Sequence, residues 1–153
     1  MPNRLKEKVV IVTGAGSIGE GWGNGKATAT LFAREGAKVL CADINVKSAK
    51  DTSDLIIDEG GDATVFGVDV SDSNQVYELI ETAVTTYGRI DILHNNVGIA
   101  EIGGPVEASE ESWDRVHDVN LKSAFLTCKH VIPLMQDQGE GSIVNVSSIS
   151  GER

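Results

Sequence analysis

The stretch VVIVTGAGSIGEGWGNGKA, residues 9–27, contains the signals that decide the fold. Its first part, Val9–Thr13, is a short continuous run of β-branched residues, which is typical of a strand buried on both faces. A glycine-rich stretch follows, and GKATATLFAREG after it carries small and apolar residues at helical spacing, with Gly36 in position to end the helix. A buried strand, a glycine-rich turn and a helix in this order predict the first βα unit of a parallel sheet.

The same alternation of strand and helix continues to the end of the chain. Further strands are expected at residues 37–43, 63–70, 90–94 and 141–148, with a helix over about 45–59. The clearest amphipathic helix follows Ser71 and Ser73, either of which could cap it, and Gly88 closes it. Ser109 is expected to cap a long helix that runs to about Met135, with Pro133 kinking its last turns or marking its end. The pattern predicts an α/β fold, a doubly wound parallel sheet with helices on both faces and right-handed crossovers.

The excess of acidic residues excludes some classes of binding partner. Asp and Glu number 23 against 13 Lys and Arg, so the formal charge is −10, which argues against binding to nucleic acid or to an anionic membrane surface. The opening MPNRLKEK lacks the apolar region of a signal peptide, and no apolar stretch is long enough to span a bilayer, so a cytoplasmic protein is expected. Cys41 and Cys128 show no metal-ligand spacing and are expected to be reduced, buried thiols; no metal site is predicted.

Candidate binding residues follow strands, as expected where ligands bind at the carboxyl ends of a parallel sheet. The segment between the first strand and the first helix could let backbone amides approach a diphosphate, with the helix N-terminus adding a favourable field. Asp43 ends the second strand, where a carboxylate can accept hydrogen bonds from both adenosine ribose hydroxyls and repel a 2′-phosphate. It could instead be a solvated residue or a helix cap. No Arg or Lys follows it before Lys47, which favours NAD over NADP.

Five segments, taken together and in order, make the sequence similar to short-chain dehydrogenases/reductases. They are TGAGS…GNGKA at 13–27, Asp43, DV at 69–70, NNVG at 95–98, and VNL at 119–121 followed by GSIVNVSS at 141–148. The resemblance covers the whole chain and implies a Rossmann-type sheet with strand order 3-2-1-4-5. A methyltransferase that uses S-adenosylmethionine would share the early strand, glycine and acid pattern, but NNVG and IVNVSS are not expected of it.

The resemblance also implies roles for individual residues. Those that would bind the cofactor are Gly14, Gly23 and Gly25 at the diphosphate, Ser17 and Asn24 beside them, Asp69 and Val70 at the adenine, and Asn96 with Gly98 near the ribose. Asn120 would anchor a water in a proton relay, and Ser148 would hydrogen-bond the substrate oxygen. The asparagines could instead satisfy buried backbone groups, and Ser147 and Ser148 could cap a strand end. Trp113 and Phe125 are expected in the core, and the three histidines are expected at the surface or in packing.

The phosphate loop departs from the family pattern. From Gly23 onward the helix aligns with the family, so Ile18–Trp22 reads as a five-residue insertion. A literal GxGxxG also occurs at Gly14, Gly16 and Gly19, and the choice of register leaves open which amides meet the phosphates. The Gly23 and Gly25 register is preferred because the helix sequence follows it at the family's spacing. Trp22 could fold over the cofactor or pack on the surface.

A second departure concerns catalysis. The family's Tyr and Lys, spaced YxxxK, are expected about a dozen residues after Ser148, and the sequence ends at Arg153. Residues 1–153 are therefore predicted to be an NAD-binding Rossmann domain truncated before that segment and inactive by itself. The complete protein is expected to be an NAD-dependent oxidoreductase acting on a small alcohol or carbonyl substrate, as a homodimer or homotetramer. The alternative is a non-catalytic NAD-binding protein, a sensor or a partner subunit.

Overall fold

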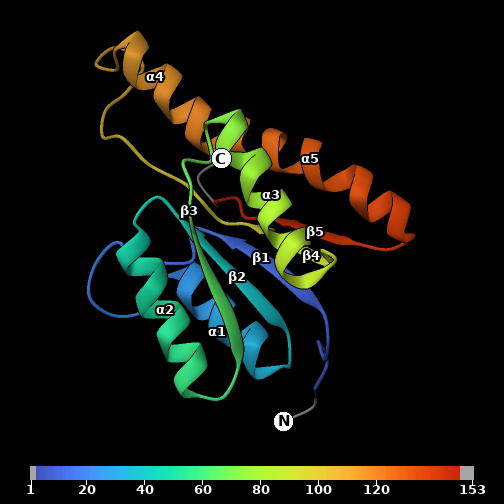
Figure 1. The fold of residues 1–153 in the computed structure, drawn as a ribbon. Coiled ribbons are helices and arrows are strands. Elements are labelled where there is room, and N and C mark those ends of the chain that lie inside the picture. Colours follow the sequence, from blue (N-terminus) through green and yellow to red (C-terminus); the bar gives the residue numbers. More distant parts are fainter. Residues whose placement is uncertain (1–2, 149–153) are drawn as a thin grey trace.

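A five-stranded parallel sheet forms the centre of the molecule (Figure 1). The structure, a computed structural model, describes residues 3–148. The strands lie in the order β3-β2-β1-β4-β5, so the predicted fold class and strand order are confirmed. Their bounds are β1 Val9–Thr13, β2 Lys38–Asp43, β3 Asp62–Gly67, β4 Ile92–Asn95 and β5 Ser142–Asn145.

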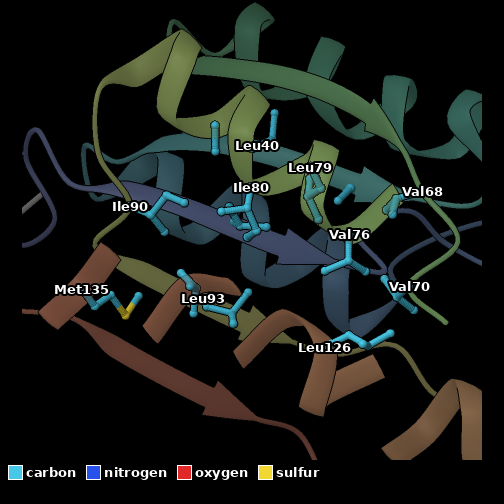
Figure 2. Close-up of a cluster of buried hydrophobic side chains, with 14 residues drawn as sticks. Leu40, Val68, Val70, Val76, Leu79, Ile80, Ile90, Leu93, Leu126 and Met135 are labelled. Atoms are coloured by element: carbon cyan, nitrogen blue, oxygen red, sulfur yellow. The ribbon is translucent and has the colours of Figure 1, made fainter. Parts of the chain in front are cut away.

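Helices cover both faces of this sheet. α1 (Asn24–Arg34) and α2 (Val46–Asp58) lie on one face, and α3 (Ser73–Tyr87) and α5 (Ser123–Gln138) lie on the other, with α4 (Glu110–His117) beyond them (Figure 1). Each face has its own apolar cluster. One joins the sheet to Ala29, Ala49 and Ile56 of α1 and α2. The other joins it to α3 and α5, as the side chains of Val76, Leu79, Leu126 and Met135 show (Figure 2).

Burial of β1 on both faces explains why its sequence is continuously apolar. All five residues of Val9–Thr13 are buried, and each pairs with β2 while the last four also pair with β4. A central strand of a parallel sheet has no face open to water, so β-branched residues fill both sides. The prediction made from this stretch is therefore confirmed.

The end of β3 and the start of α3 differ from the prediction. β3 ends at Gly67, so Asp69 and Val70 lie in the turn that follows it rather than in the strand. Asp72 caps α3, since its side chain accepts hydrogen bonds from the amides of Asn74 and Gln75, and the expected Ser71 and Ser73 caps are wrong. The Ser71 hydroxyl donates to Asp69 instead. Gly88 ends α3 in the left-handed conformation at φ 81°, as predicted.

The predicted long helix is interrupted by a π-helical segment. Ser109 caps α4 through a hydrogen bond from the Ser112 amide, as expected, and the segment η1 (Asp118–Lys122) then joins α4 to α5. Pro133 does not end the helix, because α5 continues to Gln138 and Gly139 terminates it in the left-handed conformation. The helix therefore tolerates the loss of the backbone hydrogen bond that Pro133 cannot donate.

Trp113 and Phe125 are not core residues, contrary to the prediction. They are 60 % and 61 % exposed. Leu121 of η1 and Ile132 of α5 are also exposed. Apolar side chains on a helix are buried only where another element covers that face, and within residues 3–148 no element covers this one.

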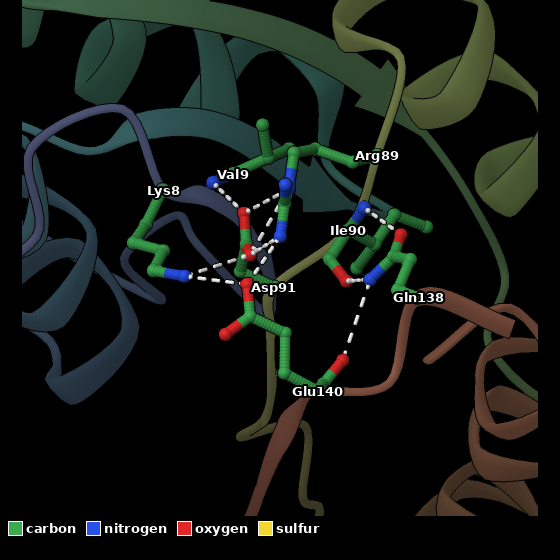
Figure 3. A network of polar contacts seen from close by, with 7 residues as sticks. All are labelled: Lys8, Val9, Arg89, Ile90, Asp91, Gln138 and Glu140. Atoms are coloured by element: carbon green, nitrogen blue, oxygen red, sulfur yellow. Dashed lines mark hydrogen bonds and ion pairs between the residues drawn. The ribbon is translucent and has the colours of Figure 1, made fainter. Parts of the chain in front are cut away.

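Charged side chains join the starts of three strands at the amino end of the sheet (Figure 3). Asp91, only 4 % exposed, accepts hydrogen bonds from the Val9 amide, Lys8 Nζ and the Arg89 guanidinium. Glu140, which precedes β5, pairs with both Lys8 and Arg89. No helix in the described part of the chain is long and apolar enough to cross a membrane.

Candidate functional site

A cavity of about 820 Å³ opens at the carboxyl ends of β1, β2 and β4. All nine residues predicted to bind the cofactor line it: Gly14, Ser17, Gly23, Asn24, Gly25, Asp43, Asp69, Val70 and Asn96. These residues come from four separate segments of the sequence. The parallel sheet brings them together because its strands end at one edge.

Gly14, Gly25 and Asn96 pack directly on one another at the base of the cavity. A Cβ added to Gly25 would overlap the carbonyl oxygen of Gly14 and lie 2.8 Å from Asn96 Nδ2. Asn96 Nδ2 donates to the Gly14 carbonyl at 3.1 Å, and the Asn96 amide donates to Thr13 Oγ1 at 3.2 Å. Gly14 has a φ of 67°, which favours glycine. Glycine at both positions therefore lets α1 begin against the end of β1.

The N-terminus of α1 faces this cavity with backbone amides that the helix cannot use. Gly23 is the N-cap, and the first amide bonded within the helix is that of Ala27, which donates to the Gly23 carbonyl at 3.0 Å. The amides of Asn24, Gly25 and Lys26 precede it and have no partner inside the helix. Such a terminus attracts an anion.

The inserted residues Ile18–Trp22 leave and rejoin the loop at almost one point. Ser17 Oγ accepts a hydrogen bond from the Gly23 amide at 3.0 Å and donates to the Gly21 carbonyl at 3.1 Å. A Cβ on Gly23 would lie 3.6 Å from Ser17 Cα, so the two ends of the insertion touch. Residues 18–22 thus form a loop whose two ends are in contact, and α1 begins directly after Gly23.

Trp22 lies at the surface rather than in the cavity lining. Its ring is 60 % exposed, and Lys26 Nζ sits 5.4 Å from the ring centroid. Ile18, fully exposed, lines the cavity instead.

Asp43 is held in place by two backbone amides. Oδ2 accepts from the Gly16 amide and Oδ1 from the Asn45 amide, each at 2.9 Å. A carboxylate has about four acceptor positions, so two remain for a ligand. Asp43 therefore connects the glycine loop to the second strand and still lines the cavity.

Asp69 and Val70 line the cavity from the turn that follows β3. Asp69 Oδ1 accepts from the Ser71 amide at 2.9 Å and from its hydroxyl at 2.7 Å, and the Asp69 amide donates to Gln75 Oε1. Val70 is 5 % exposed and belongs to the apolar cluster beneath α3. Hydrogen bonds and packing therefore hold the turn after β3 at the point where it meets the cavity.

The two predicted catalytic residues are outside the lining that the described residues form. Asn120, in the π-helical segment, uses both ends of its amide on Ile99, with Oδ1 accepting from the Ile99 amide and Nδ2 donating to its carbonyl, both at 2.8 Å. Ser148 follows β5, whose continuation is tied to β4 by the Val146 amide donating to the Asn95 carbonyl at 2.9 Å. Asn120 is thus connected to the loop that follows β4, and Ser148 lies two residues beyond the Val146 contact with β4.

Several lining residues were not predicted from the sequence. They are Ile18, Ile44, Asn45, Val68, Ser71, Val97, Ile99, Arg115, Asp118 and Val119; Gly98 was expected near the ribose, and Gly16 belongs to the alternative glycine register. Asp118 and Arg115 lie two and five residues before Asn120, spacings that do not share its helical face, so the VNL segment did not indicate them. Ser48 and Thr52 of α2, which contact the glycine loop, had no sequence signal.

The geometry agrees with comparison to known proteins. The sequence matches the family model for short chain dehydrogenase over residues 8–153. The chain belongs to the short-chain dehydrogenase family. Among curated members, an uncharacterized oxidoreductase of Bacillus subtilis is 44 % identical over 149 residues, which cover 97 % of this chain and 52 % of that protein. The 3-oxoacyl-[acyl-carrier-protein] reductase of Thermotoga maritima is 43 % identical over 152 residues, covering 97 % of this chain and 58 % of that protein.

Solved structures of the family have the same fold. A protein described as a short-chain dehydrogenase/reductase from Burkholderia xenovorans superposes with a TM-score of 0.95 at 49 % identity, over 98 % of this chain and 60 % of its own. A 7α-hydroxysteroid dehydrogenase in complex with NADH and 7-oxo glycochenodeoxycholic acid gives a TM-score of 0.91 at 32 % identity, over 99 % of this chain and 57 % of its own. This chain therefore spans between half and three fifths of the length of these four proteins.

Proposed function

We propose that this chain is the NAD-binding portion of an oxidoreductase that transfers a hydride between the nicotinamide cofactor and an alcohol or carbonyl substrate. The observation that carries the proposal is Asp43, held by the amides of Gly16 and Asn45 beside the glycine loop with two acceptor positions left. Two ribose hydroxyls would occupy those positions. The carboxylate charge would repel the 2′-phosphate of NADP.

The glycine loop fits a dinucleotide. Its tight packing of Gly25 on Gly14 leaves room for a diphosphate above the N-terminus of α1. We infer that the amides of Asn24 and Gly25 bind the diphosphate, with Gly14, Gly23 and Ser17 shaping the loop. Asp69 would accept a hydrogen bond from the adenine amino group through Oδ2, since both of its hydrogen bonds from Ser71 use Oδ1.

The bound nicotinamide would supply the hydride acceptor or donor. In the same proposal Asn96 holds the turn after β4 beside the cofactor ribose, through its bond to Gly14. Asn120 orders Ile99 at the cavity rim, and Ser148 hydrogen-bonds the substrate oxygen. Two family members support the reaction class, because one is a reductase of 3-oxoacyl thioesters and another is a cyclohexanol dehydrogenase.

Cofactor titration tests the proposal. The protein is expected to bind NADH more tightly than NADPH, measured by calorimetry. Replacing Asp43 with Ala removes hydrogen bonds to a charged acceptor, each of which contributes about 1.5–3 kcal/mol, so NADH affinity should fall at least tenfold. NADPH affinity should be unchanged or higher, because the repulsion is lost.

Asp51→Ala is the matched control, since Asp51 is an exposed carboxylate of the adjoining helix α2 that does not line the cavity. It should leave both affinities unchanged. Tighter binding of NADPH by the unaltered protein would refute the role of Asp43. Binding of neither cofactor would refute the proposed function.

A further inference from the structure

The part of the glycine loop that precedes the insertion is held by α2. Ala15 donates its amide to the Ala42 carbonyl at 3.1 Å, and its carbonyl accepts from Thr52 Oγ1 at 2.8 Å. The amide of Gly16 donates to Asp43. The amide of Ser17 donates to Ser48 Oγ at 2.7 Å, and Ser48 Oγ donates back to the Ser17 carbonyl at 2.9 Å.

These bonds leave the amides of Ala15, Gly16 and Ser17 without a free hydrogen. They are therefore occupied by the protein, and a diphosphate must find its donors farther along the loop. This disfavours the literal GxGxxG register at Gly14, Gly16 and Gly19. It also shows that β2 and α2 set the position of the loop's first half.

Ser48 is the residue of α2 that lies closest to the loop. A Cβ on Gly16 would overlap the Ser48 side chain, so the loop backbone rests directly on it. The Ser48 amide donates to Asn45 Oδ1 at 3.1 Å, which fixes the first turn of α2. A hydroxyl can donate and accept at once, so Ser48 satisfies both backbone groups of Ser17, which no apolar residue could do.

Ser17 passes this constraint to the start of α1. Its own hydroxyl accepts from the Gly23 amide and donates to the Gly21 carbonyl, which closes the insertion. Gly23 is the N-cap of α1. A chain of contacts therefore runs from Ser48 through Ser17 to Gly23, and from there to the amides of Asn24 and Gly25, which have no partner inside the helix.

We propose that Ser48 is a positioning residue for cofactor binding, which acts through Ser17 to hold the N-terminus of α1 where it meets the diphosphate. The proposal rests on the proposed function and adds a specificity to it. Ser48 should matter for ligands that carry the diphosphate and not for adenosine, which would contact Asp43 and Asp69. Preorganising the loop lowers the cost of ordering it on binding.

The test compares ADP-ribose with adenosine by calorimetry. Ser48→Ala removes both hydrogen bonds between Ser48 and the Ser17 backbone, so the Kd for ADP-ribose should rise about tenfold or more while that for adenosine changes less than twofold. Ser48→Thr keeps the hydroxyl and should restore affinity for ADP-ribose. Ser53→Ala removes a buried hydroxyl one turn farther along α2 and should change neither affinity.

Ser17→Ala breaks the same chain at its next contact and should give the same selective loss, which keeps the test decisive if Ser48→Ala fails to fold. If the Ser48 and Ser17 variants lose affinity for ADP-ribose and for adenosine equally, or lose affinity for neither, the positioning role is overturned while the proposed function stays intact. Failure of the unaltered protein to bind ADP-ribose and NADH would overturn the proposed function itself.

Discussion

His94 is a histidine on β4 that the fold keeps away from water. It is 8 % exposed, packs edge-on against the Phe32 ring at 6.0 Å between centroids, and its Nδ1 has no hydrogen-bond partner within residues 3–148. Burial lowers the pKa of His94 below its ordinary value, because an imidazolium there would lose its hydration. The folded state therefore favours the neutral form of the His94 ring.

This lowered pKa predicts that acid destabilises the protein. Above the unfolded pKa of about 6.5 the ring is neutral in both states and contributes no pH dependence. As the pH falls below that value the unfolded state gains a proton first, so the free energy of unfolding decreases by at most about 1.4 kcal/mol per pH unit until the folded pKa is reached. Denaturant unfolding between pH 7.5 and 5.5 measures the slope.

His94→Leu should remove most of this slope, since leucine does not titrate. His117→Gln is the control, because His117 is exposed beside Trp113 and should leave the slope in place. An unchanged slope in the His94 variant would show that another group causes the acid sensitivity.

Which residues the sequence could identify depends on how restricted their chemistry is. Gly14 and Gly25 could be found because the close contact between β1 and α1 has room for no side chain. Asp43 could be identified because few residue types at the end of the second strand can accept hydrogen bonds from two ribose hydroxyls. Ser48 could not, because a serine in the first turn of a helix most often only caps it. Its role appears only when α2 is placed against the loop.

The π-helical segment between α4 and α5 is the least regular element beside the cavity. Such segments insert a residue into a helix and are frequent at functional sites. Here the segment carries Asn120, whose amide makes both hydrogen bonds to Ile99. Asp118 and Val119 of the same segment line the cavity. The element therefore joins the loop after β4 to the candidate cavity.

Asn120→Ala should loosen this loop selectively. Losing two hydrogen bonds of about 0.5–1.5 kcal/mol each should speed hydrogen exchange at the Ile99 amide about tenfold or more, with little change in the core strands. Mass spectrometry of the peptide that contains Ile99 measures it. Asn74→Ala alters an exposed asparagine of α3 as the control, and equal acceleration in both variants would refute the role of Asn120.

The order and kind of the elements were predictable, whereas several of their ends were not. The helix α3 shows why, because Ser71, Asp72 and Ser73 can all serve as N-caps. Asp72 caps it, and its two hydrogen bonds from Asn74 and Gln75 amides hold its pKa below the ordinary value. Ser71 is used by Asp69 instead. Competition among adjacent polar residues is settled by tertiary contacts that periodicity does not contain.

The candidate binding cavity and the charged network around Asp91 lie at opposite ends of the sheet (Figure 3). The cavity lies at the carboxyl ends of the strands, and the charged network of Asp91 lies at the amino ends (Figure 3). The apolar face formed by Trp113, Leu121, Phe125 and Ile132 belongs to neither. Periodicity shows that a helix has an apolar face but not what covers it, which is why the aromatic residues were misplaced in the core.

This separation predicts that Asp91 affects stability and not cofactor binding. Desolvation raises the pKa of Asp91, but hydrogen bonds from Arg89, the Val9 amide and Lys8 outweigh it and hold the pKa below its ordinary value. The stabilisation is therefore present above a pH of about 4 and is lost as the pH falls through the folded pKa.

Asp91→Asn removes the charge while keeping the size of the side chain. Because Asp91 is buried where β1, β4 and β5 begin, the free energy of unfolding at pH 7 should fall by about 1–3 kcal/mol in denaturant titrations. NADH affinity should stay within twofold, since no residue of this network lines the cavity. Glu140→Gln, at the exposed end of the same network, should cost less stability. A weaker affinity for NADH in the Asp91 variant at full occupancy of the folded state would mean that the two ends of the sheet are coupled.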